Sequence, residues 1–439
     1  MKPLVFSLLA SLFVANANAL SLSDAYLAAV KNDAQLRATV AQTEAARESL
    51  PQASARLLPT VGVTGSRFEI HQERTDNGVS ARPQDYPSYS VTLSLRQPIY
   101  SPRLWAAKDQ AKASVAGSEA GLDSERQSLA NRLALAYANV ALAYERDRLI
   151  TTQERSAESR LMAANKAFQA GVGIRTDIDE VQAQLDLLRA QRLQAGQAIQ
   201  IAHEELRQIT GIRFQGRILI DPNFPKANLT NQDLESWLMR VRAENPEIRS
   251  RASQVIAAQA AARAVSADHL PTLELVAQLS RSSSENNFFV NSKTSTEAVG
   301  FQISVPIYQG GFLRSRDRQA RAEVTASEEV LERVRLSVEI AASKQFYGLK
   351  EGLSRVQALQ TAVASGEQVV LANQKSFLAG LRSMLDILSA EQRLAQVHLE
   401  LSQARLQVFL AWVQLNALVG SANEDIFRQV SEWFVLNQN

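Results

Sequence analysis

Residues 58–66 read LPTVGVTGS, and residues 270–278 read LPTLELVAQ, 212 positions later. Other motifs return at nearly the same interval: QPIY at 97–100 as VPIY at 305–308, FQAG at 168–171 as FLAG at 377–380, and ITG at 209–211 as LVG at 418–420. A repeat of about 210 residues is too long for a solenoid, whose units hold about 20–50 residues. The chain is therefore built from two halves of one architecture.

Two segments in each half alternate between apolar and polar residues, as strands with one polar face do. Residues 89–95 (YSVTLSL) and 299–305 (VGFQISV) alternate most clearly, and the partner segments begin near Val61 and Leu273. Each segment covers about 10 residues, the length of a tilted membrane-spanning strand. A half-buried sheet on a soluble core is the alternative, and alternation alone favours it.

The surroundings of these strands favour a membrane instead. Long polar loops are predicted at 71–88 and 282–297, both on one side of the sheet. Aromatic residues gather near the opposite strand ends, as in the girdle of an outer-membrane barrel. These residues are Tyr100, Trp105, Tyr308 and Phe312.

Four strands cannot close into a barrel, and lipid does not tolerate an open strand edge. Two copies would supply eight strands around a filled interior, whereas three copies would supply twelve around a lumen. The side chains predicted to face inward are small and polar, which suits a wet lumen: Ser90, Thr92, Ser94, Gln302 and Ser304. We therefore expect a homotrimer.

Most of the remaining chain is predicted to be helical, with long helices at 102 to about 170 and at about 311–379. At about 1.5 Å per residue, each would be roughly 100 Å long. Shorter helices are expected at about 21–57 and 176–210. Apolar heptads near the end of the second half recur 209 residues earlier, broken once at Arg192, which predicts coiled-coil packing. A plain coiled-coil stalk is the alternative on heptads alone.

The N-terminus predicts export. Lys2 precedes an apolar run at 4–14 and an alanine-rich cleavage site, so residues 1–19 form a predicted signal peptide. No later segment offers the roughly 18 uncharged apolar residues of a transmembrane helix. The absence of cysteine excludes disulfides and a lipid on an N-terminal cysteine. The 47 basic and 45 acidic residues are nearly balanced, which argues against nucleic acid as a partner.

No enzyme motif is complete. His203-Glu204 begins like HExxH, but Arg207 stands at the place of the second histidine. The histidines are scattered, without a second ligand at metal-site spacing: His71, His203, His269 and His398. We expect no catalytic residue, no cofactor and no metal.

The signal peptide, the duplicated halves, the two strands per half and the very long helices together resemble the TolC family of outer-membrane channel-tunnels. The most specific signals are the LPT and PIY segments, and the likeness runs from Leu20 to about Gly420. It implies a mainly α fold with a membrane β-hairpin in each half. Coiled-coil helices would form a periplasmic α-barrel, and four strands per chain would contribute to a trimeric 12-strand outer-membrane β-barrel.

The resemblance implies a passive exit duct in the bacterial outer membrane that extends into the periplasm. An inner-membrane pump of the ABC or RND type would recruit it through a periplasmic adaptor (membrane fusion) protein, for type I secretion or efflux. Outer-membrane lipid would surround the strands. The alternative function is a periplasmic coiled-coil adaptor or scaffold without channel activity.

In the family, hydrogen bonds and salt links near the helical tips hold the periplasmic end closed. Thr176, Asp177 and Arg382 match that pattern, whereas Phe377 stands where TolC has a tyrosine. Ser389 replaces the second of two inward aspartates, which leaves Asp386 to form a single acidic ring that attracts cations. Capping is the alternative role, because residues 176–179 and 383–386 each fit a capping box.

The predicted organisation has five parts. They are the signal peptide at 1–19, a first repeat at 20–211, an inter-repeat equatorial segment at 212–230, a second repeat at 231–420 and a tail at 421–439. Trp433 and Phe434 predict that the tail docks, together with the equatorial segment, around the waist of the helical part.

Overall fold

The computed structural model describes residues 21–80, 82–214, 216–224, 233–286 and 289–437. The predicted signal peptide and part of the equatorial segment lie outside the described residues. The chain divides into two units, one of residues 40–122 and 247–336 and the other of residues 1–39, 123–246 and 337–439. The first unit contains the main sheet, and the second contains the helical tips.

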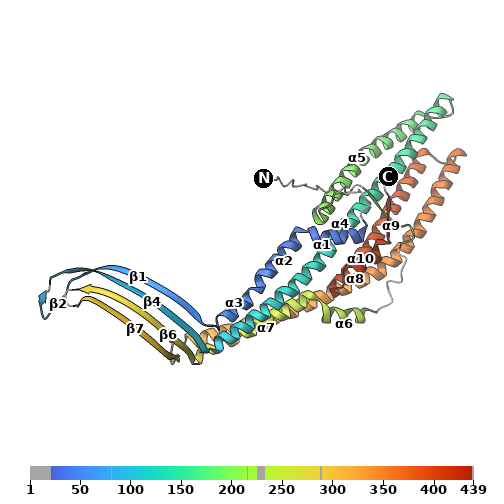
Figure 1. Cartoon of the computed structure of the whole chain (residues 1–439). Coiled ribbons are helices and arrows are strands. Elements are labelled where there is room, and N and C mark those ends of the chain that lie inside the picture. The colour runs from blue at the N-terminus through green and yellow to red at the C-terminus, as the bar shows by residue number, and fades with distance from the viewer. Residues whose placement is uncertain (1–20, 81, 215, 225–232, 287–288, 438–439) are drawn as a thin grey trace, which may run out of the picture. The chain divides into compact units, whose positions relative to one another are not determined.

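Four antiparallel strands form the main sheet in the order β1-β4-β6-β7 (Figure 1). They are β1 (Thr60–Gln72), β4 (Gln84–Tyr100), β6 (Thr272–Asn286) and β7 (Phe289–Ser304). Each half contributes one hairpin, and the two hairpins join through the β4–β6 ladder. The predicted two strands per half are therefore present, and β1 and β7 form the edges of the sheet within the described residues.

The polar loops predicted at 71–88 and 282–297 are wrong, because strands occupy most of both segments. Gln72 pairs with Gln84. Between them lies a small pair of strands, β2 (Thr75–Asp76) and β3 (Val79–Ser80). The ladder extends beyond the apolar region because cross-strand backbone hydrogen bonds do not require apolar side chains, and threonine and tyrosine themselves favour strands.

The register gives the sheet one apolar and one polar face, since residues directly opposite each other share a face. The apolar face includes the pairs Val61–Leu95, Val63–Leu93, Leu273–Ile303 and Leu275–Phe301. On the polar face, the hydroxyl of Thr92 donates to Ser280 at 3.2 Å. Val276 interrupts the alternation and lies on the polar face, where it pairs with Gly300 on β7 and with Arg96 on β4.

Besides the short helices before β1, three helices lie in the same unit as the sheet. They are the first part of α4 (Pro102–Gln169), α7 (Pro246–Ser266) and the first part of α8 (Phe312–Leu378). The hydroxyl of Ser250 on α7 donates to the Gly117 carbonyl on α4 at 2.9 Å. A Cβ at Gly117 would lie 3.4 Å from the Cβ of Ser253, so the absent side chain lets the two helices approach closely.

The helical unit confirms the long helices and much of the heptad pattern. The second parts of α4 and α8 belong to it with α5 (Arg175–Thr210) and α9 (Met384–Val419). Val408 and Leu415 of α9 are fully buried, and Leu185 and Leu206 of α5 almost so. The predicted apolar seam therefore packs inward.

The polar interruption of the heptads at Arg192 makes an ion pair. Its Nη1 lies 2.8 Å from Oε2 of Glu154 on α4, and Glu154 is buried. Arg189 also reaches Glu154, at 3.8 Å. The interruption thus links α5 to α4 by charge at a point where the seam lacks an apolar side chain.

The single helix predicted at 21–57 is wrong, because the chain forms α1 (Leu22–Asn32), α2 (Ala34–Arg47) and α3 (Ser49–Ala55). At the first break, Oδ1 of Asp33 accepts a hydrogen bond from the Leu36 amide at 2.7 Å and caps α2. Both carboxylate oxygens of the buried Asp33 also pair with Arg132, at 3.1 and 3.2 Å. A similar break at Asn245 separates α6 (Leu234–Glu244) from α7.

The tail docks onto the segment between the halves. After α10 (Glu424–Ser431), strand β8 (Phe434–Asn437) pairs antiparallel with β5 (Arg217–Ile220). The buried Trp433 ring packs on Phe224, with centroids 4.7 Å apart. The expected docking of Trp433 and Phe434 is therefore present, and their position at the waist of an assembly stays a prediction.

Hydropathy along the described helices is too low for any of them to cross a bilayer.

Two glycines on α8 provide a test of helix packing. A Cβ at Gly352 would lie 2.8 Å from Cγ2 of the buried Val408, whereas within the described chain a Cβ at Gly348 would meet nothing within 4 Å beyond its chain neighbours and its own helix backbone. We expect Gly348→Ala to raise the midpoint of thermal unfolding, since alanine favours a helix by about 1 kcal/mol over glycine. Gly352→Ala should lower it, because overpacking costs about 1–3 kcal/mol.

The measurement is the thermal midpoint by circular dichroism of both variants in detergent. Equal stabilisation by the two substitutions would contradict the close approach of α8 and α9 at Val408.

Candidate functional site

Two short turns form the tips of the helical unit. In the first, between α4 and α5, Gly171 has a φ of 75° and the Val172 amide donates to the Ala167 carbonyl at 3.0 Å. A Cβ at Gly173 would lie 2.8 Å from the backbone nitrogen of Phe168, so this position also requires glycine. The turn therefore depends on two glycines in the sequence AGVG.

The second tip, between α8 and α9, repeats this geometry. Gly380 has a φ of 76°, and the Leu381 amide donates to the Ser376 carbonyl at 2.9 Å. Both tips thus end a long helix with a left-handed glycine and a six-residue hydrogen-bonded loop, as in a Schellman motif. The repeated FQAG and FLAG sequences encode the same helix end twice.

The capping interpretation is correct for the second tip. The Ser383 hydroxyl accepts from the Asp386 amide at 3.3 Å, and Asp386 Oδ2 accepts from the Ser383 amide at 2.9 Å. These bonds form a capping box at the start of α9. The hydrogen bonds from the Ser383 amide and hydroxyl, helped by the Arg382 charge, hold the pKa of Asp386 below its usual value.

The capping box predicted at residues 176–179 is wrong. Helix α5 begins at Arg175, and its cap position is Ile174, which makes no side-chain cap hydrogen bond. Asp177 follows Ile174 by three positions, as Asp386 follows Ser383, so the acid is retained where the cap hydroxyl is missing. Thr176 lies one residue inside the helix and is exposed.

The other candidate gate residues have distinct surroundings. Arg382 Nη1 lies 3.4 Å from Asp386 Oδ1, and both side chains are substantially exposed. Ser389 is half-buried one turn further along α9. Within the described chain, no hydrogen bond or ion pair joins Thr176 or Asp177 to the second tip.

Phe377 packs against an apolar cluster and does not point into open space. The cluster joins three helices through the buried side chains Ile150, Ala157, Val181, Leu185, Leu188, Ala195, Met384 and Ile387. Its residues come from α4, α5 and α9, so it fastens the start of α9 to the first helical pair. The phenylalanine therefore has a packing role that does not need a hydroxyl.

A polar link near this cluster was missed from the sequence. Glu391 on α9 forms an ion pair with Arg160 on α4 and accepts from the Ser156 hydroxyl at 3.3 Å. The side chains of Arg160 and Glu391 are only 14% and 21% exposed. Pairing in such a site is strongly coupled, because either charge alone would be left desolvated. Periodicity cannot reveal which helix faces Glu391.

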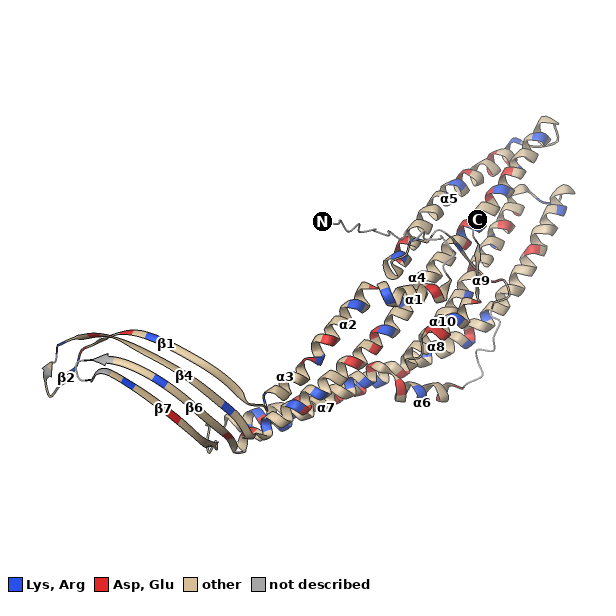
Figure 2. Ribbon diagram, viewed as in Figure 1, with Lys and Arg blue, Asp and Glu red and all other residues tan. Residues whose placement is uncertain are grey.

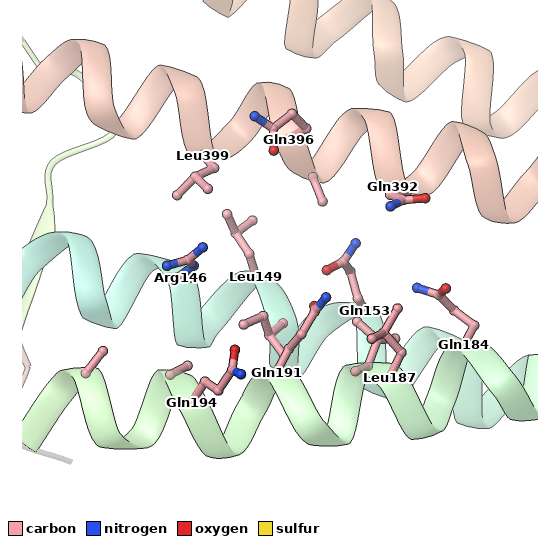
Figure 3. Close-up of a pocket in the computed structure, with 15 residues that line it drawn as sticks. Arg146, Leu149, Gln153, Gln184, Leu187, Gln191, Gln194, Gln392, Gln396 and Leu399 are labelled. Atoms are coloured by element: carbon pink, nitrogen blue, oxygen red, sulfur yellow. The ribbon is translucent and has the colours of Figure 1, made fainter.

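A groove lies further along the same three helices. Figure 3 shows glutamine side chains of α5 and α9 facing each other across Leu149 and Gln153 of α4. The cavity is about 300 Å³, and Arg146 supplies its only charge among the described lining residues. Its lining residues include Gln184, Gln191, Gln194, Gln392 and Gln396. The groove thus offers neutral donors and acceptors.

The predicted interface aromatics stand at the junction of strands and helices. Tyr100 ends β4 and packs edge to face on Trp105, with ring centroids 5.3 Å apart. Tyr308 and Phe312 stand at the corresponding junction after β7, and all four side chains are exposed.

In the described residues, no acidic or histidine cluster is suited to a metal ion.

Comparison with known proteins identifies the architecture. A family model described as outer membrane efflux protein matches residues 25–212 and 237–421, which is most of the chain. The chain belongs to the outer membrane efflux protein family. The resemblance to the TolC family is thereby confirmed. This family consists of transport channels and not of enzymes.

Several curated relatives span nearly the whole length of the chain. Proteases secretion protein PrtF of Dickeya chrysanthemi is 30% identical over 99% of this chain and 95% of its own length. Alkaline protease secretion protein AprF of Pseudomonas aeruginosa is 30% identical over 96% of this chain and 88% of its own. Outer membrane protein TolC of Escherichia coli is 26% identical over 96% of this chain and 86% of its own.

Several solved structures share the fold of this chain. CusC matches with a TM-score of 0.80 at 16% identity, covering 91% of this chain and 92% of its own. The Campylobacter jejuni CmeC outer membrane channel matches with a TM-score of 0.80 at 15% identity, covering 92% of this chain and 87% of its own. The chain is thus an outer-membrane exit duct for secretion or efflux, and the adaptor or scaffold alternative is not favoured.

The cap at Ser383 can be tested by hydrogen exchange. Ser383→Ala should speed exchange of the first amides of α9 about fivefold, since loss of a serine cap costs about 1 kcal/mol.

Because the folded pKa of Asp386 is lowered, the stability that it contributes is present above the usual aspartate pKa of about 3.9 and is lost as the pH falls through the lowered value.

The measurement is amide exchange of residues 384–387 across that pH range, corrected for intrinsic rates. Thr176→Ala is the matched control and should leave exchange at the start of α5 unchanged. Equal effects at both tips would contradict the different caps.

Proposed function

We propose that this chain is the outer-membrane exit of a type I secretion system that exports proteins. The observation that carries the proposal is the 30% identity, over nearly the full length of both chains, to two proteins whose names describe protease secretion. Small-molecule efflux is the second candidate. It is favoured by the relative named pyoverdine export outer membrane protein OpmQ, of Pseudomonas aeruginosa, which is 26% identical over 89% of this chain.

We propose that the working form is a homotrimer. Within the described residues, the main sheet of one chain has two unpaired edges, at β1 and β7, and lipid does not tolerate such edges. Three sheets would close a 12-strand barrel with the hydroxyl-rich face toward the lumen. The apolar face with Val63 and Phe301 would then meet lipid. The predicted division into repeats at 20–211 and 231–420 fits this arrangement.

We propose that the tips bind a periplasmic adaptor, which connects the duct to an inner-membrane pump of the ABC type. Support comes from apolar side chains that are solvent-exposed on the two glycine-containing turns. Val172 is 82% exposed and Leu381 is 79% exposed. Burial of such side chains against a partner is favourable at about 25 cal/mol per Å². The chain itself would supply the passage and no catalysis.

We propose that Thr176, Asp177, Phe377, Arg382, Asp386 and Ser389 form the gate of the assembled duct. The single chain supports part of this proposal, because the paired side chains of Arg382 and Asp386 are both substantially exposed and can meet a neighbouring copy. Asp386 would then serve two roles, as a cap within its own helix and as an acidic ring across the assembly. The link from Arg160 to Glu391 would keep each α9 seated while the gate is closed.

The secretion proposal predicts a specific loss in a deletion strain. Removal of the gene should abolish the extracellular protein that the partner pump exports and leave tolerance to drugs and detergents unchanged. Secretion is measured by mass spectrometry of the culture medium, and tolerance by growth inhibition, with the wild-type gene restored on a plasmid as control. Unchanged secretion with lowered drug tolerance would overturn protein export in favour of efflux.

The gate proposal predicts the behaviour of Arg382→Ser. Loss of the guanidinium should loosen the closed end and raise single-channel conductance severalfold in planar bilayers. Arg428→Ser is the matched control, because Arg428 also makes an exposed pair with an acid one turn away, in the tail at Glu424. Unchanged conductance of Arg382→Ser would leave Arg382 as a surface charge.

A further inference from the structure

Positive charge is concentrated where the main sheet passes into helices. The segments concerned are residues 102–112 of α4, 258–269 at the end of α7, and 312–321 of α8. Together they carry eight basic and three acidic residues, although the whole chain is nearly balanced. The basic residues are Arg103, Lys108, Lys112, Arg263, Arg314, Arg316, Arg318 and Arg321. Figure 2 shows blue positions on the helices next to the sheet.

Two of these arginines occupy positions that the helix dipole disfavours. Arg103 lies in the first turn of α4 and Arg314 in the first turn of α8, at the positive ends of their helices. Neither first turn contains an acidic residue. Within the described residues Arg314 has no acidic partner, so helix stability does not explain the choice of arginine there, whereas an anion outside the chain would.

The acidic residues nearby neutralise only part of this charge. Asp268, whose side chain is 12% exposed, pairs with Arg103 at 3.4 Å and Arg316 at 3.1 Å. Asp317 pairs with Arg321 at 2.9 Å, and Asp109 lies 3.9 Å from Arg263. Within the described residues, no acid pairs with the four remaining exposed cations: Lys108, Lys112, Arg314 and Arg318.

A groove at this place combines cationic and apolar walls. Its volume is about 770 Å³, and its charged lining consists of Arg263, Arg321 and Asp109. The apolar lining comes from three helices and from the leucine of the second LPT motif: Trp105, Ala106, Ala262, Leu270 and Val324. Cations beside an exposed indole and aliphatic side chains suit a phosphate joined to hydrocarbon better than they suit a free ion.

The groove lies next to the strand ends of the main sheet. Leu270 lies two residues before β6 begins, and Trp105 follows the end of β4 by five residues. Tryptophan and tyrosine prefer the headgroup level of a bilayer, where one side of the ring is apolar and the other is wet. Basic residues at this level attract anionic lipids. In the proposed outer-membrane assembly, the groove would thus lie at the depth of phospholipid headgroups.

We propose that this groove binds an anionic phospholipid, such as phosphatidylglycerol, in the leaflet where the strands meet the helices. Arg263 and Arg321 bind the phosphodiester, while Trp105, Leu270 and Val324 contact the glycerol and upper acyl chains. The proposal depends on the outer-membrane location and not on the exported substrate. It therefore survives or fails independently of the secretion proposal.

The test is native mass spectrometry of the full-length mature protein in detergent, titrated with phosphatidylglycerol or phosphatidylcholine. We expect the assembled protein to retain phosphatidylglycerol at least severalfold better than phosphatidylcholine. Equal retention of the two lipids would overturn the proposal without any variant. A neighbouring copy that covers the groove in the assembly would give that same result.

Paired variants locate the site. Arg263→Gln with Arg321→Gln should remove the preference for phosphatidylglycerol. The matched control is Arg67→Gln with Arg281→Gln, which removes the same charge from β1 and β6 and should keep the preference. The mass of the assembly in each spectrum reports folding of the variants. Retention that is equally selective in both double variants would overturn the site.

A competition experiment distinguishes lipid from free anion. Inorganic phosphate is added to the wild-type protein carrying phosphatidylglycerol. We expect the lipid to remain bound, because its acyl chains contact the apolar walls. Displacement of the lipid at equal concentrations of phosphate would overturn the lipid assignment and indicate a site for free anions.

Discussion

A backbone amide or carbonyl that enters hydrocarbon finds no water to bond, and this constraint governs how the chain must be organised. Two hairpins placed far apart in the sequence meet through β4 and β6, so in the part of the chain that the structure describes only β1 and β7 retain open edges of this sheet. Helices satisfy their own backbone bonds, and the chain changes from strand to helix near Pro102 and Phe312. The edge strands therefore require another strand to pair with their backbone groups, whereas the helices do not.

Local periodicity was sufficient to predict the main elements of this fold. The alternation in YSVTLSL and VGFQISV identified strands, and heptads identified the buried sides of α5 and α9. One wrong prediction, the single helix at 21–57, arose because one polar residue decides where the first helix ends. Asp33 ends α1 because its carboxylate is held by Arg132, almost 100 residues away, and no window of sequence contains both residues. The polar ends of the strands lacked apolar alternation, although backbone pairing continued through them.

The sequence predicts the two helical turns of the candidate site, but it does not predict most of the side-chain contacts between its helices. The repeated FQAG and FLAG sequences located both tips, and Ser383 with Asp386 identified the cap of α9. The pairing of Arg160 with Glu391 depends on which helices lie side by side, which heptads do not specify. The same applies to Phe377, whose ring is held by a cluster drawn from three helices.

The two tips share a turn but not a cap, since Ile174 stands where the other half has Ser383. A protein assembled from separate copies of a single half would have to carry identical tips, and any mutation would change all of them together. Fusion of two halves into one chain removes that restriction. Selection can then retain a stable helix start in one half while the other half diverges, and the duplicated gene acquires two specialised ends from one ancestral design.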